Sequence, residues 1–164
     1  MILQFPIAHD DELLVSILAR FVSRQGLRDD KVALDVLFGS RNIIPSALLQ
    51  GHVQALLSHV DHIWLISDNE VIQRHSILPF FQSFVEPSRI QDVRYSLIYN
   101  DKSHVMTSIG VNASSTKWPR YYRYCPECVA EDQEHLAYSY WRRLFQLPGV
   151  IVCPKQASVH SRKN

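Results

Sequence analysis

The feature that most constrains this chain is a pair of Cys-Pro segments at residues 125–128 (CPEC) and 153–156 (CPKQ), separated by 24 residues. Each segment places thiols on a tight turn that can direct sulfur atoms toward one tetrahedral ion. Two such half-sites are typical of a zinc ribbon or a related finger. The spacing therefore predicts a structural zinc site held by Cys125, Cys128 and Cys153.

The fourth ligand does not follow from the spacing. Position 156, where a Cys or a His would complete the second half-site, is Gln. A neutral amide is a poor zinc ligand beside thiolates. His160, seven residues after Cys153, is the nearest substitute, and a water molecule could also complete the coordination sphere. We predict His160 as the fourth ligand.

Other interpretations of the cysteines stay open. Buried thiols could pack together without a metal. A redox Cys-x2-Cys pair would lack the βαβ context expected of it and would give Cys153 no role. A catalytic zinc would need a general base, and no Glu or His lies at a recognisable spacing. The odd number of cysteines, three, fits metal binding in a reducing compartment better than a disulfide framework.

Hydrophobic periodicity predicts helices along most of the chain. The acidic residues 10–12 precede an apolar stripe over residues 13–21, a pattern that places them at a helix N-terminus, and Gly26 ends this helix. Later stripes and turn residues predict further helices at 29–38, 45–60, 69–74, 79–84 and 87–99. Residues 110–116 (GVNASST) are expected to form a loop.

The expected fold is therefore mainly α. We predict a helix-turn-helix-like bundle over residues 1–112 and a small zinc-ribbon-like module with short strands over residues 113–164. A plain helical bundle fits the same N-terminal periodicity.

Basic residues concentrate near the cysteines. Residues 1–110 hold nine Lys/Arg and twelve Asp/Glu, whereas residues 111–164 hold eight and four. This asymmetry predicts phosphate contacts by Lys117, Arg120, Arg123, Arg142, Arg143 and Lys155. In the alternative interpretation, aromatic residues between the half-sites form a small core around the metal and the arginines extend from it into solvent.

The composition also excludes several classes. An apolar fraction of 46% and a charged fraction of 20% are those of a folded globular chain. No segment approaches the roughly 18 apolar residues of a membrane span, and the N-terminus turns acidic too early for a signal peptide. We expect a cytoplasmic protein that acts outside the membrane and has no small-molecule substrate.

Two blocks of the sequence resemble the TniQ family. Residues 5–20 (FPIAHDDELLVSILAR) are similar to the family's opening. RYCPECVAED and YWRRLFQLPGVIVCPKQ are similar to its Cys-Pro-x-Cys, its Trp-Arg and Leu-Pro-Gly segment, and its closing Cys-Pro-x-His. Between the blocks, RHSILPFFQSF resembles the members that select transposition targets. The matching opening residues are Pro6, Asp11, Glu12, Leu13, Ser16 and Arg20.

The resemblance implies a non-enzymatic protein of DNA transposition. Such family members bind an attachment-site DNA and recruit an AAA+ ATPase, and through it the transposase. Carried over, the Zn²⁺ ligands are Cys125, Cys128 and Cys153, and Gln156 stands where the family has His. Family members are longer, so we expect an N-terminal portion or a shortened homologue. An adaptor that docks on the ATPase without reading DNA is the alternative.

Overall fold

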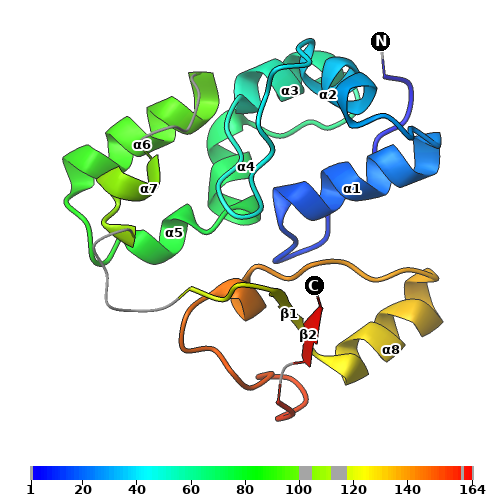
Figure 1. Cartoon of the computed structure of the whole chain (residues 1–164), viewed down its shortest axis with the longest axis vertical. Helices are drawn as coiled ribbons and strands as arrows, with labels where there is room; N and C mark the ends of the chain where they lie inside the picture. Colours follow the sequence, from blue (N-terminus) through cyan, green and yellow to red (C-terminus); the bar gives the residue numbers. More distant parts are fainter. Residues whose placement is uncertain (1, 100–104, 112–117, 160, 164) are drawn as a thin grey trace.

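The structure is a computed structural model that describes residues 2–99, 105–111, 118–159 and 161–163 (Figure 1). We call residues 2–111 the helical region and residues 118–163 the cysteine module. The helices of the helical region are α1 (Leu14–Gln25), α2 (Asp30–Phe38), α3 (Val53–Val60), α4 (Asp68–His75), α5 (Leu78–Phe81), α6 (Pro87–Tyr99) and α7 (Val105–Ser108).

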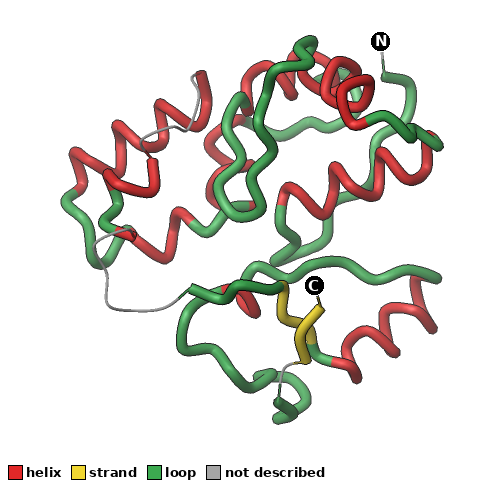
Figure 2. Tube along the Cα trace, in the orientation of Figure 1, coloured by secondary structure: helices red, strands yellow, loops and turns green. Residues whose placement is uncertain are grey.

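The cysteine module lies beneath α1 and combines short elements with long loops (Figures 1 and 2). Its elements are β1 (Tyr122–Tyr124), α8 (Pro126–Leu136), the 3-10 helix η2 (Leu144–Gln146) and β2 (Ser161–Lys163). β1 and β2 pair antiparallel, with Arg123 opposite Arg162. The prediction of a mainly α fold that includes short strands is confirmed. The predicted boundary between residues 112 and 113 lies outside the described residues.

The first two helices follow from their sequences. α1 buries an apolar stripe that includes Ile17 and Phe21, and it ends at Gly26, whose φ of 65° is left-handed. The Asp29 side chain caps α2 by accepting hydrogen bonds from the backbone N–H groups of Lys31 and Val32. Residues 26–29 form the short turn between α1 and α2 that a helix-turn-helix arrangement requires. DNA reading by these helices stays a prediction.

Two sequence-based expectations in the helical region were wrong. The helix expected from residue 45 begins only at Val53, after His52, whose φ of 58° is left-handed. The preceding turn is held instead by side chains, because the Ser46 N–H donates to the Gln50 side chain at 2.7 Å. The acidic residues 10–12 do not form the first turn of α1, which contains no acid. They belong to a contact with the cysteine module.

Two hydrophobic clusters stabilise the molecule. The larger joins the helices of the helical region, and half-buried Tyr122 and Trp141 of the cysteine module pack against it. The smaller consists of Cys125, Cys128, Cys153 and Phe145, with Leu144 packed beside them. No described helix combines the length and apolar character that a membrane span needs.

His75, at the end of α4, is buried and ties the helices to the N-terminal segment. Its Nδ1 donates a hydrogen bond to the backbone carbonyl oxygen of Glu12 at 2.8 Å. Its ring packs against the Trp64 ring, with the ring centroids 5.7 Å apart. Burial lowers the pKa of His75 below its ordinary value of 6.5, although the hydrogen bond to Glu12 opposes this shift. The folded state therefore favours the neutral imidazole more strongly than the unfolded chain does.

We expect His75 to make stability depend on pH. Because its folded pKa lies below its unfolded one, its contribution is complete above about pH 6.5 and is lost as the pH falls. The free energy of unfolding should drop between about pH 7.5 and about pH 5.5, and His75→Gln should reduce that drop. His135→Gln, at an exposed site on α8, is the matched control. An equal drop in both variants would contradict the assignment to His75.

Candidate metal centre and its contact with the helices

Three buried cysteines converge from two parts of the cysteine module. Cys125 follows β1 at the N-cap of α8, Cys128 lies in the first turn of that helix, and Cys153 lies in the loop after η2. Their sulfur atoms all lie within 4.8 Å of one another, and the Sγ atoms of Cys128 and Cys153 are 3.6 Å apart. Zinc–sulfur distances of about 2.3 Å in a tetrahedron give sulfur spacings of about 3.8 Å.

The local sequence explains this convergence. Pro126 is set for the first turn of a helix, so α8 begins directly after Cys125 and turns Cys128 back toward it. The Cys153 carbonyl accepts from the Ala157 N–H at 2.8 Å, and the Cys153 N–H donates to the Ser158 carbonyl at 2.8 Å. These bonds close a tight turn that presents Cys153 to α8.

The thiols differ in their tendency to ionise. Burial alone would raise the pKa of Cys125, but hydrogen bonds from the Ser158 hydroxyl, the Cys128 backbone and the two neighbouring thiols lower it overall. Burial, followed by the other two thiols, raises the pKa of Cys128 to about 12. Three thiolates therefore need a cation to coexist here. Sulfur donors at this spacing favour a thiophilic ion such as zinc, so the residues fit the metal.

The Gln156 side chain, at the fourth position of the second Cys-Pro segment, is bound to α8. The Gln156 side-chain amide donates to a carboxylate oxygen of Glu131 at 2.5 Å, and the other oxygen of Glu131 pairs with Lys155. Gln156 is therefore directed at α8. Ser158 Oγ lies 3.1 Å from Cys125 Sγ. His160 lies outside the described residues, so its role as the fourth ligand stays a prediction.

Asp11 joins the helical region to the cysteine module. Its backbone carbonyl accepts from the Arg143 N–H at 2.7 Å, and its carboxylate accepts from Arg143 Nε at 3.1 Å and from the Leu144 N–H at 3.0 Å. Asp11 has a φ of 60°, a left-handed conformation that non-glycine residues seldom adopt. These contacts offset the cost of that conformation.

Glu12 is fully buried beside it. Its carboxylate accepts from Ser16 Oγ at 2.7 Å, from the His9 N–H at 3.1 Å and from two guanidinium nitrogens of Arg20 at 3.0 and 2.6 Å. Ser16 Oγ in turn accepts from the Trp141 N–H at 3.1 Å.

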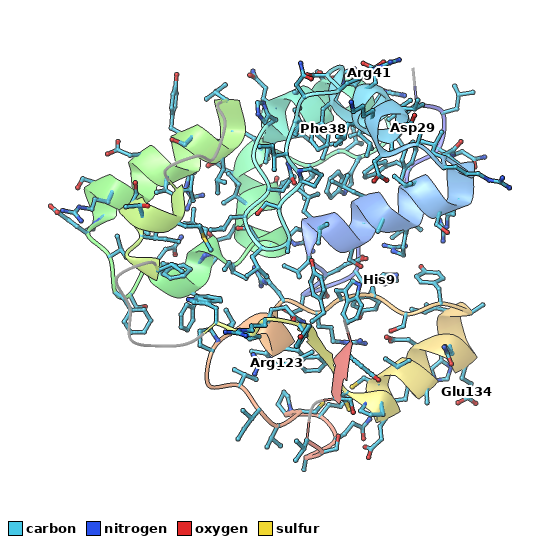
Figure 3. All side chains as sticks on the ribbon, viewed as in Figure 1. His9, Asp29, Phe38, Arg41, Arg123 and Glu134 are labelled. Atoms are coloured by element: carbon cyan, nitrogen blue, oxygen red, sulfur yellow. The ribbon has the colours of Figure 1, made fainter. Side chains whose placement is uncertain are left out.

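The backbones of the two parts also pair directly. The Leu13 N–H donates to the Trp141 carbonyl at 2.9 Å, and Glu12 forms an isolated antiparallel bridge with Arg142. We call residues 11–16 and 141–144 together the seam. Figure 3 shows His9 between the helical region and the cysteine module.

Two arginines predicted to contact DNA are held by residues of the protein itself. Arg142 makes a two-pronged ion pair with Asp132 at 2.7 and 2.8 Å, and its guanidinium covers the Tyr140 ring at 4.2 Å. Burial opposes the charge of Arg142, but the bonds to Asp132 outweigh burial and its pKa is raised. Arg143 pairs with Asp11 and donates to the carbonyl of Gln73 at 2.5 Å.

The other four predicted contact residues differ in their surroundings. Arg123 donates to the backbone carbonyls of Val150 and Leu147, and Lys155 pairs with Glu131. Arg120 is exposed and has no hydrogen-bond or ion-pair partner among the described residues. Lys117 lies outside them. DNA contact by any of the six stays a prediction.

Several residues that organise the site have no signature in the sequence. Asp132 and Glu131 hold Arg142 and Lys155, yet nothing in the periodicity of α8 distinguishes them from other surface acids. The sequence did give a signal for the seam. Asp11, Glu12, Ser16 and Arg20 are among the opening residues on which the resemblance to the family rests.

The TniQ family model matches residues 3–157. The chain belongs to the TniQ family. The transposon Tn7 transposition protein TnsD of Escherichia coli is 28% identical to it over 155 residues, which cover 94% of this chain and 30% of that protein. The chain thus spans less than a third of the length of this relative. In this TniQ chain the opening block, residues 5–20, and the Trp-Arg segment, residues 141–143, lie on the two sides of the seam.

We expect this TniQ protein, purified without added zinc, to contain about one zinc ion per chain, because three buried sulfurs lie at zinc-ligand spacing. Elemental analysis measures the content. Cys153→Ser should remove most of the metal and destabilise the cysteine module, since binding energy at such sites contributes to folding. Folded wild-type protein with less than about a tenth of an equivalent would contradict the site.

A pair of variants tests the fourth ligand in the same assay. His160→Ala should increase the rate at which a chromogenic chelator removes zinc. Gln156→Ala should leave that rate near the wild-type value, because the Gln156 amide is bound to Glu131. The reverse order of the two variants would assign the position to Gln156.

Proposed function

We propose that this chain selects target sites for transposition by binding attachment-site DNA and recruiting the AAA+ ATPase that controls the transposase. The match of the TniQ model over residues 3–157 carries this proposal. The similarity to TnsD, a transposition protein by name, supports it. The chain covers 30% of TnsD, so the proposal concerns the functions that this portion contributes.

The geometry of the cysteines supports a structural metal. Cys125 and Cys153 are 0% exposed and Cys128 is 2% exposed, so the sulfur ligands are closed to solvent. Catalytic zinc sites keep a coordination position open to substrate, whereas structural sites are closed. The metal would thus hold α8 and the loop of Cys153 in a fixed arrangement. This supports a non-enzymatic role for the module.

Arg120 is the predicted contact residue best placed to meet DNA phosphates. It is exposed two residues before β1, and its neighbour Tyr121 is 47% exposed. A guanidinium without a carboxylate partner among the described residues can donate to phosphate oxygens at little cost. Arg142 is less well placed, because its two-pronged pair with Asp132 already balances its charge.

Charge reversal at Arg120 tests the DNA-binding part of the proposal. Arg120→Glu should weaken binding to attachment-site DNA and reduce the slope of log affinity against log salt by about 0.9 or more, because a phosphate contact is lost. The midpoint of thermal unfolding should stay near that of the wild type, since the side chain is exposed. Fluorescence anisotropy at several salt concentrations measures the slope.

Arg89→Glu is the matched control, because Arg89 is exposed on α6 and has no partner among the described residues. It makes the same charge change far from β1 in the sequence. Equal effects of the two variants on the salt slope would contradict a specific contact at Arg120. Reversal at Arg142 is a poorer test, because a new carboxylate beside Asp132 would destabilise the fold.

A second candidate function is a protein adaptor that docks on the ATPase without reading DNA. The ion pairs of Arg142, Arg143 and Lys155 with Asp132, Asp11 and Glu131 favour it, because these pairs reduce the positive charge available to phosphates. Pull-down of the ATPase by protein that shows no salt-dependent DNA binding would support this function over the first.

A further inference from the structure

A pocket of about 520 Å³ opens between β1, α8 and the segment that follows α8. Its volume lies within the roughly 300–1,000 Å³ of small-ligand sites. Tyr124 comes from β1, and Val129 and Gln133 lie one turn apart on α8. Ser139, Tyr140 and Trp141 complete the lining. No proposed role of the metal or of Arg120 involves this pocket.

The walls of the pocket are aromatic and held in place. Trp141 stacks on Tyr122 with ring centroids 4.8 Å apart, and Tyr124 meets Trp141 edge-on at 6.4 Å. Tyr140 stacks on His9 at 4.6 Å with an interplanar angle of 12°. Rings fixed by such contacts present preformed flat surfaces. Because His9 and Arg142 already cover the Tyr140 ring, Trp141 and Tyr124 are the lining rings against which a flat ligand can stack.

The pocket also offers hydrogen-bonding groups. Gln133 is exposed, and its side-chain amide has no hydrogen-bond partner among the described residues. This amide presents a donor and an acceptor side by side, the pattern that pairs with the edge of a base. The Ser139 hydroxyl donates to Asp132 at 2.7 Å, which leaves its oxygen free to accept.

The charges beside the pocket decide which flat ligand fits. Aromatic pockets often bind cations, but here the Arg142 guanidinium already covers the Tyr140 ring. Arg20 and Arg24 lie over the ring of Tyr138, 4.9 and 5.3 Å from its centre. Arg24 is exposed and has no carboxylate partner among the described residues. Arg142 is balanced by Asp132 and Arg20 by Glu12, so Arg24 is the cation of these three that favours a ligand carrying phosphate.

We propose that this pocket binds an unpaired nucleobase, stacked against the aromatic walls and hydrogen-bonded at its edge by Gln133, with the attached phosphate near Arg24. The proposal deepens the proposed function, on which it rests, because the base would belong to a distorted target DNA. The same chemistry would accept a free nucleotide, so the test includes both sources.

The experiment measures the binding of the full, zinc-loaded chain to three fluorescent duplexes of one sequence by anisotropy. One is fully paired, one carries a single bulged adenine, and one carries an abasic bulge. The bulged adenine should strengthen binding about tenfold over the paired duplex, and the abasic bulge should not, since a base stacked on aromatic side chains supplies the difference. Unlabelled dAMP, added as a competitor, tests whether the pocket binds a free nucleotide as well as a base in DNA.

Gln133→Ala should reduce the preference for the bulged adenine about fivefold or more and leave binding to the paired duplex unchanged. Gln54→Ala, an exposed glutamine on α3 without a side-chain partner among the described residues, is the control and should retain the preference. Both sites are exposed, so both variants should fold. If dAMP displaces the bulged duplex at a concentration similar to the duplex concentration needed for saturation, the result would support the pocket and assign it to free nucleotides.

Equal affinity for all three duplexes, or an unchanged preference in Gln133→Ala, would overturn the nucleobase site. In that case salt-dependent binding of the paired duplex would still stand, and with it the proposed function. Failure to bind any duplex would overturn both.

Discussion

The buried carboxylate of Glu12 is the interaction on which the arrangement of this molecule depends. An unpaired charge in a protein interior is costly, yet this one is 0% exposed because Arg20, Ser16 and the His9 N–H all donate to it. The backbone of the same chain segment pairs with the backbone of Trp141 and Arg142. A change that removed Arg20 would leave this buried charge without its cation, and the seam would lose its support.

The seam also connects the candidate metal centre to the first helix. Cys128 and Asp132 lie one turn apart on α8, and Asp132 holds Arg142, which bridges to Glu12. A metal that fixes α8 would therefore fix the seam as well. For a protein that we propose to act between DNA and an ATPase, this continuity would keep the surfaces of the helical region and the cysteine module at a constant spacing.

The sequence predicted the features that depend on local spacing. The stripe of α1 and the Asp29 cap of α2 needed only neighbouring residues, and the repeated Cys-Pro motif predicted the convergence of the three cysteines. The start of α3 was wrong because side-chain bonds such as Ser46 to Gln50 replaced the expected helical turn. The partner of Arg143 could not be predicted, because the Asp11–Arg143 pair joins residues 132 positions apart. The partner of Arg142 was missed because nothing in the periodicity of α8 distinguishes Asp132 from other surface acids.

Amide hydrogen exchange at the seam tests this account most directly. The N–H groups of Leu13, Trp141, Arg143 and Leu144 all donate across it. We predict that these four amides exchange as slowly as the buried amides of α3, such as that of Leu56, because they become exposed only when the fold opens as a whole. Exchange as fast as that of exposed loop amides in the zinc-loaded protein would contradict the seam.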